Sequence, residues 1–356
     1  MYKSSRQVNV GGVTVGGGAP VRIQSMNNTK TADVKATLDQ IFKLRDCGCD
    51  ITRVAIPNME AAQALKEITA ASPIPVVADI HFDYRLAIEA AMNGAAKIRI
   101  NPGNIGGPEN VKKVVDVCKE RCIPIRVGVN SGSCERALVD KYGGVCAQAL
   151  CESALGAVKL LEDCDFGDVV VSIKSSSPKL TIETYRTLAS MCDYPRHVGV
   201  TEAGTLKEGV IKSAVGIGAL LAEGIGDTIR VSLTDDPTEE VYAAISILKA
   251  LGLKTGGIDF VSCPTCGRTQ VPLIEIANKV EERISRMPYN IKVAVMGCPV
   301  NGPGEAKEAD IGMAGSIDEF VLFKKGKICG KIIAKDIDAA VEEFVQEVIK
   351  TGEEQD

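Results

Sequence analysis

The chain has 356 residues, of which 45% are hydrophobic and 24% are charged, and its net charge is −5. This is ordinary globular composition, in a chain long enough for two or three hydrophobic cores. The acidic balance, the 4% aromatic content and the lack of a long apolar run argue against nucleic-acid binding and against a membrane span.

The first two-thirds of the chain predicts a regular alternation of strands and helices. The glycine-rich segment Asn9–Pro20 comes first and lacks the lysine of a phosphate loop, so we expect a hairpin that caps the following domain. The predicted strands are Val21–Met26, Ile51–Ile56, Pro75–Ile80, Ala96–Ile100, Pro124–Val129, Asp168–Lys174, His197–Thr201 and Thr228–Leu233. Predicted helices between them include Ala32–Cys47, Met59–Ala71, Pro108–Arg121, Thr205–Glu223 and Pro237–Leu251.

This alternation implies parallel strands joined by right-handed crossovers. About eight such units are expected of a closed (β/α)8 TIM barrel, which we assign to residues 1–254 as the substrate-binding domain. A doubly wound open sheet is the alternative.

A second, smaller α/β domain is predicted for residues 255–356, after the glycine-rich boundary Gly252–Gly257. Its expected elements are the strands Ile258–Ser262 and Ile291–Met296, the helices Val271–Arg286 and Asp336–Lys350, and a tight hairpin turn at Lys325-Gly326.

The chain contains 13 cysteines, an odd number, and begins with no recognisable secretion signal. A reducing cytoplasm is therefore the expected location. Most of these cysteines should be small buried hydrophobic residues in or near helices, namely Cys47, Cys49, Cys118, Cys122, Cys146, Cys151, Cys164 and Cys192.

Cysteines with the spacing of metal ligands are confined to the second domain. Cys263 and Cys266 follow one predicted strand, and Cys298 follows the next, in a loop that ends at Glu305. The carboxyl ends of neighbouring parallel strands lie side by side, so the two loops should meet. Thiolates suit an iron–sulfur cluster or zinc, and a closed zinc site would need Cys329, which we expect in a strand and the core. Three cysteines with an oxygen ligand favour the cluster.

Polar side chains gather at the carboxyl ends of the predicted barrel strands, where barrel enzymes place their sites. The cations are Arg53, Arg99, Arg126, Lys174 and Arg230, and nearby are Asp79, His81, Asn130, Thr201, Glu202 and Ser232. Five converging cations predict an anionic ligand, such as a diphosphate. In the alternative interpretation the cations pair with carboxylates, for which Asp79 and Glu202 are available; these two and His81 are also candidates for proton transfer.

Several motifs resemble the 4-hydroxy-3-methylbut-2-en-1-yl diphosphate synthases, in the shorter two-domain bacterial type. They are ADIHF (78–82), IRINPGN (98–104), RVGVNSGS (126–133), GVTEAG (199–204), IRVSLT (229–234), CPTCGR (263–268) and MGCPVNGPGE (296–305). The resemblance implies a TIM barrel followed by an iron–sulfur domain similar to sulfite and nitrite reductase modules. It further implies a 4Fe-4S cluster on Cys263, Cys266, Cys298 and Glu305, and a homodimer.

The implied substrate is 2-C-methyl-D-erythritol 2,4-cyclodiphosphate, reduced with electrons from flavodoxin or ferredoxin. The motifs carry substrate-binding roles onto Arg53, Asp79, His81, Arg99, Arg126, Asn130, Lys174, Thr201, Arg230 and Ser232, and catalytic roles onto Glu202 and Glu305. Two functions from other classes compete with this reading. One is a zinc-stabilised barrel lyase or aldolase acting on a sugar phosphate through Lys174, and the other is a non-enzymatic iron sensor or scaffold.

Overall fold

The computed structural model describes residues 5–299, 304, 306–316, 319–333 and 336–355. The chain separates into two compact units, Met1–Lys254 and Thr255–Asp356, each of which is described by itself. Glu305, predicted as a ligand and a catalytic residue, lies outside the described residues. In the described part, no helix has the length and apolar character needed to cross a membrane.

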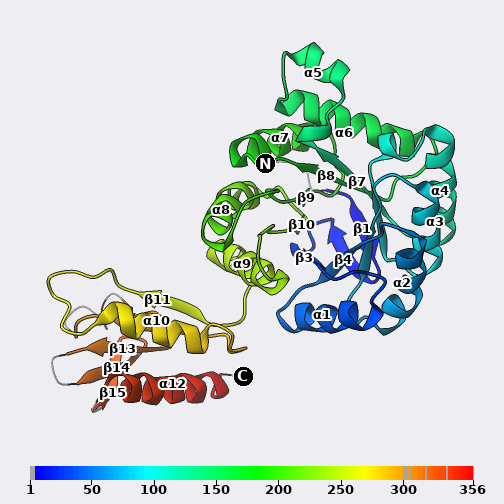
Figure 1. Ribbon diagram of the computed structural model, residues 1–356. Helices are drawn as coiled ribbons and strands as arrows, with labels where there is room; N and C mark the ends of the chain where they lie inside the picture. Colours follow the sequence, from blue (N-terminus) through cyan, green and yellow to red (C-terminus); the bar gives the residue numbers. More distant parts are fainter. Residues whose placement is uncertain (1–4, 300–303, 305, 317–318, 334–335, 356) are drawn as a thin grey trace. The chain divides into compact units, whose positions relative to one another are not determined.

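The first unit is an eight-stranded parallel barrel, with strand order β8-β7-β6-β5-β4-β3-β10-β9 (Figure 1). Parallel bridges from Val171 to Arg196 and from Ser175 to Val200 link β8 to the β9 segment and close the ring. The barrel prediction is confirmed, and the open-sheet alternative is wrong. The strands are β3 Arg22–Met26, β4 Ile51–Ala55, β5 Val76–Asp79, β6 Lys97–Ile100, β7 Ile125–Asn130, β8 Val169–Lys174, β9 His197–Val198 and β10 Thr228–Ile229.

Helices surround this ring of strands (Figure 1). Their start points follow from local sequence signals. Four helices begin at a capping side chain that accepts a hydrogen bond from a backbone N–H group, namely Asp33, Asn58, Ser177 and Asp236. Apolar faces on the helices then pack against the branched strand residues in one continuous core. The helices are α1 Val34–Asp46, α2 Met59–Ala71, α3 Tyr84–Met92, α4 Pro108–Glu120, α5 Arg136–Tyr142, α6 Ala147–Glu162, α7 Pro178–Met191, α8 Leu206–Ala222 and α9 Pro237–Ala250.

An N-terminal hairpin seals one end of the barrel, as the sequence predicted. Its strands β1 Gln7–Val10 and β2 Val13–Gly16 pair antiparallel and turn at two glycines with positive φ. Valines of the hairpin cluster with Ile51, Val77 and Val170, which lie near the amino ends of their strands. The amino end of the barrel is therefore apolar and closed, which leaves the carboxyl end for polar chemistry.

The second unit is a five-stranded mixed sheet of order β11-β12-β13-β14-β15. Strands β11, β12 and β13 pair parallel, and β14 pairs antiparallel with both β13 and β15. Two helices pack on one face through a large apolar cluster, and a smaller cluster with Ala306 and Ala309 covers part of the other. The elements are β11 Asp259–Ser262, α10 Leu273–Ile284, β12 Lys292–Met296, β13 Ile311–Gly315, β14 Phe320–Lys324, β15 Lys327–Ile332 and α12 Ile337–Glu353.

Some sequence expectations need correction. Strand β13 was not predicted, while the hairpin turn at Lys325 and Gly326, both with positive φ, is confirmed. Cys122 is exposed because it lies in the turn after α4, and Cys329 is exposed because β15 is an edge strand whose side chains face solvent there. Burial of a thiol thus depends on strand position as well as on residue type.

Candidate active site

The barrel carries a pocket of about 390 Å³ at the carboxyl ends of its strands. A smaller void beside it, of about 10 Å³, shares Lys174 and Thr201 and adds His197, Arg230 and Ser232. Arg53 and Arg126 line neither and are fully buried in the barrel. The predicted residues that line the larger pocket are Asp79, His81, Arg99, Asn130, Lys174, Thr201 and Glu202.

Asp79 is the counter-ion for two of the arginines. Its carboxylate accepts a hydrogen bond from Arg99 Nη1 at 3.0 Å and lies 3.7 Å from Arg53 Nε. His81 Nε2 lies 3.8 Å from the same carboxylate. Burial alone would raise the pKa of Asp79, but the two guanidinium groups outweigh it and hold that pKa well below its ordinary value. Asp79 therefore stays charged and orients the arginines.

The remaining cationic donors are not all satisfied. Arg53 donates to the Met26 thioether and Arg126 Nη1 to Gln24 Oε1 at 3.3 Å. Burying a donor without an acceptor is costly, so such a cluster favours an incoming anion. In the described part of the chain, the buried donors inside the barrel without a partner are Gln24 Nε2, Arg53 Nη1, Lys97 Nζ, Arg99 Nε, and Arg126 Nε and Nη2.

Arg230 has a carboxylate partner that the sequence did not reveal. Glu240, in the first turn of α9, accepts from Arg230 Nη2 at 3.1 Å and from Arg230 Nε at 3.3 Å. Glu202, which the alternative interpretation offered as a partner for a cation, is exposed at the mouth and forms no ion pair in the described residues. Its φ of +52° is unusual for a residue with a side chain, and such strained backbone clusters at functional sites.

Two more buried basic residues were not predicted. Lys97 lies two positions before Arg99 on β6, and this spacing puts both side chains on one face of the strand. The spacing was therefore a signal in the sequence that Lys97 lies inside the barrel with Arg99. Burial first, and the Arg126 and Arg53 guanidinium groups second, lower the pKa of Lys97 well below its ordinary value. His197 is buried with Nδ1 2.7 Å from Thr228 Oγ1, and burial with the same cations lowers its pKa. Both side chains are held toward their neutral forms.

Lys97→Met is expected to stabilise the ligand-free protein at pH 7, by about 1–4 kcal/mol. With its pKa lowered in the folded state, Lys97 binds fewer protons there than in the unfolded chain, so the wild type gains stability as the pH rises. The advantage of the variant should therefore shrink between pH 7 and pH 9. Melting temperatures of both proteins at the two pH values measure this, with the exposed Lys112→Met as control. Equal shifts in both variants would contradict the assignment.

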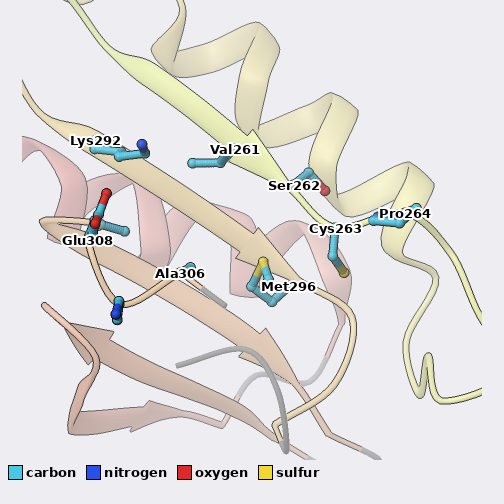
Figure 2. A pocket seen from close by; sticks show the side chains of 10 residues that line it. Val261, Ser262, Cys263, Pro264, Lys292, Met296, Ala306 and Glu308 are labelled. Carbon is cyan, nitrogen blue, oxygen red and sulfur yellow. The ribbon is translucent and has the colours of Figure 1, made fainter. Parts of the chain in front are cut away.

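The two cysteine loops of the second unit meet, as the sequence predicted. Strand β11 pairs parallel with β12, and the Gly297 backbone N–H, next to Cys298, donates to Cys263 Sγ at 3.2 Å. Figure 2 shows Cys263 where β11 ends and Met296 at the end of the neighbouring strand, lining a pocket of about 430 Å³. Cys266 is exposed, and hydrogen bonds from Arg268 lower the pKa of its thiol.

These thiols have the donor chemistry of an iron–sulfur site. Cys263 is half-buried, Cys298 is buried and Cys266 is exposed, at the ends of adjacent parallel strands. Soft sulfur ligands on two touching loops fit a cluster, and the lowered pKa of Cys266 favours the thiolate that binds metal. Within the described residues, no three His, Cys, Asp or Glu side chains form a ready-made metal site.

The fold is thus that of the TIM-barrel proteins, with a cationic pocket at the carboxyl ends of the barrel strands, followed by a small α/β domain with cysteines at the ends of two adjacent strands. Residues 5–245 match the GcpE TIM-barrel domain, and residues 259–350 match the GcpE protein C-terminal domain. The chain belongs to the GcpE family. The two alternative functions, a zinc-stabilised lyase and an iron sensor or scaffold, are therefore wrong.

Curated relatives agree over nearly the full chain. A protein of Ruminiclostridium cellulolyticum is 57% identical over 344 residues, which cover 97% of each chain. One from Caldanaerobacter subterraneus is 56% identical over 355 residues, covering 100% of this chain and 99% of that protein. Both carry the name 4-hydroxy-3-methylbut-2-en-1-yl diphosphate synthase (flavodoxin).

Solved structures of other proteins resemble this chain in fold alone. The dihydropteroate synthase of Stenotrophomonas maltophilia superimposes with a TM-score of 0.51 and 14% sequence identity, covering 70% of this chain and 98% of that one. The enzyme of Vibrio fischeri gives 0.50 and 12%, covering 70% and 99%. At such low identity the likeness concerns the barrel architecture.

Proposed function

We propose that this chain catalyses the reaction of its named relatives, 4-hydroxy-3-methylbut-2-en-1-yl diphosphate synthesis in the methylerythritol phosphate pathway. The substrate is 2-C-methyl-D-erythritol 2,4-cyclodiphosphate, and the product is (E)-4-hydroxy-3-methylbut-2-enyl diphosphate. In the balanced reaction the substrate takes up two electrons and two protons. The carbon–oxygen bond to one ring phosphate breaks, a carbon–carbon double bond forms, and a hydroxyl leaves as water. The observation that carries this proposal is the cationic barrel mouth in a chain of this family.

The barrel residues would bind and orient the diphosphate. Arg53, Arg99, Arg126, Lys174 and Arg230 supply charge and hydrogen-bond donors, several of which lack an acceptor in the described structure. Fixing the diphosphate holds the reacting carbons in one orientation and so lowers the entropic part of the barrier. His81, Asn130, Thr201 and Ser232 add polar groups for the substrate, and Asp79, besides its proposed contact with substrate, holds Arg53 and Arg99 in place.

Glu202 is the residue that we propose for handling the departing hydroxyl. It lines the mouth of the pocket and is exposed, so it can exchange its proton with solvent. Its backbone adopts a positive φ at the rim of the pocket, and the proposal places there the proton transfer that accompanies the departure of water.

A 4Fe-4S cluster would be held by Cys263, Cys266 and Cys298, with Glu305 as the fourth ligand, and when bound it supplies electrons one at a time. Flavodoxin, which appears in the relatives' names, or ferredoxin would be the electron donor. We further propose residues 1–254 as the substrate domain and residues 255–356 as the cluster domain, in a cytoplasmic homodimer.

The test is turnover of the cyclic diphosphate by anaerobically purified protein with reduced flavodoxin, alongside assays of iron and acid-labile sulfide. We expect about four of each per chain, with product formation. Zinc without sulfide, or no product with a loaded cluster, would overturn the proposal.

Lys174→Met tests the anion site separately. The variant lacks a hydrogen-bond donor at the pocket, an amine whose pKa is lowered first by burial and then by the Arg53 and Arg126 guanidinium groups. We therefore expect it to bind inorganic pyrophosphate about 10–100-fold more weakly. Isothermal titration calorimetry measures this, with exposed Lys112→Met as the control. Unchanged affinity in the Lys174 variant would contradict the assignment.

A further inference from the structure

We propose that Glu240 is a positioning residue that sets Arg230 for the diphosphate. This inference rests on the proposed function, in which Arg230 binds substrate. None of the motifs contains Glu240; it lies on α9, outside the ring of strands that bears the other candidates.

The Glu240 carboxylate is buried and fully engaged. It accepts from Arg230 Nη2 at 3.1 Å and Nε at 3.3 Å, from Ser25 Oγ at 3.0 Å, and from the Leu233 backbone N–H at 3.0 Å. Only 4% of the residue is exposed, while the Arg230 side chain is 18% exposed. The carboxylate thus holds the Arg230 guanidinium through Nε and Nη2, and Arg230 also lines the void shared with Lys174 and Ser232.

These contacts lie where the first and last barrel strands in the sequence, β3 and β10, pair. Strands β3 and β10 are paired only at Arg22 with Thr228 and at Ile23 with Ile229. Ser25 and Leu233 lie beyond that short ladder, and Glu240 bridges them. The one carboxylate therefore ties the first and last strands together where Arg230 must be held.

Glu240 could act as a neutralising charge or as a positioning residue, and these two roles predict opposite changes in anion affinity when the carboxylate is removed. Glu240 contributes a negative charge close to Arg230 and within electrostatic range of Arg53. If it served only as a neutralising charge, removing that charge would leave the mouth more positive and would tighten anion binding. If it positions Arg230, removing the charge frees the guanidinium and weakens binding.

The experiment measures inorganic pyrophosphate affinity by calorimetry on the full-length, cluster-loaded protein. For Glu240→Gln we expect about tenfold weaker binding and a higher KM for the cyclic diphosphate. Glu240→Asp keeps the charge but is one methylene shorter, so positioning predicts weaker binding there too. The matched control is Glu223→Gln, which removes a surface arginine partner, since Arg186 Nε donates to Glu223 at 3.0 Å.

A double-mutant cycle excludes a merely structural effect. In an Arg230→Met background, Glu240→Gln should change pyrophosphate affinity no further, whereas a general loss of barrel stability would act in both backgrounds. Tighter or unchanged binding in Glu240→Gln, wild-type binding in Glu240→Asp, or additive effects would each overturn the inference. Failure of the wild type to bind pyrophosphate would instead refute the proposed function.

Discussion

Replacing Cys298 with alanine is expected to remove iron and acid-labile sulfide from the purified protein and to abolish turnover. Cys298 is buried beside the loop of Cys263, and its thiol is one of the three proposed sulfur ligands. A cluster held by three cysteines and one weaker ligand does not tolerate the loss of a strong one. Anaerobic preparation followed by iron and sulfide assays measures the effect.

The control for this variant is Cys329→Ala in the same domain. Cys329 is exposed on the edge strand β15, and we expect its removal to leave the iron content unchanged. This control also tests Cys329 as the fourth ligand of a zinc site. Retention of wild-type iron and sulfide in Cys298→Ala would refute the ligand assignment.

Asp79→Asn is expected to destabilise the barrel by about 3–5 kcal/mol at neutral pH. The change leaves Arg53 and Arg99 buried without their shared counter-ion, and an uncompensated buried charge is expensive. Urea unfolding followed by circular dichroism measures the loss. The comparison is Asp83→Asn, which removes a surface pair with Arg85 and should have little effect.

The pH dependence of this difference follows from the pKa of Asp79, which is lowered in the folded state. A lowered carboxyl pKa contributes stability that is fully present above the unfolded value, about 3.9, and is lost as the pH falls toward the folded value. The gap between wild type and Asp79→Asn should thus be constant from pH 7 to about pH 5 and narrow below it. A gap that widens on acidification would contradict this account.

Much of the fold follows from local sequence pattern. Residues such as Ile51 and Val54 form β-branched runs, and the helices between them carry capping side chains such as Asn58 and Ser177. Those signals act over a few residues, so they can be recognised from the sequence alone. Strand β13 escaped notice because its IGMAG segment has little β-branched character.

The approach of the two cysteine loops was also predictable. Cys263 and Gly297 follow two strands of one β-α-β unit, and parallel pairing brings the carboxyl ends of such strands together. Arg99 and Lys174 could be placed at the barrel mouth by the same rule, because each lies near the end of its strand.

The sequence by itself thus determined the alternating architecture, the cationic barrel mouth and the cysteine-bearing strand ends. Only the tertiary structure decided which charges neutralise one another: Asp79 serves both Arg53 and Arg99, and Glu240 rather than Glu202 serves Arg230. It also decided that Lys97 is fully buried without a partner in the described residues. The physical reason is that periodicity fixes the face on which a side chain lies, whereas ion pairing depends on strand register and on how far a side chain reaches from a neighbouring element.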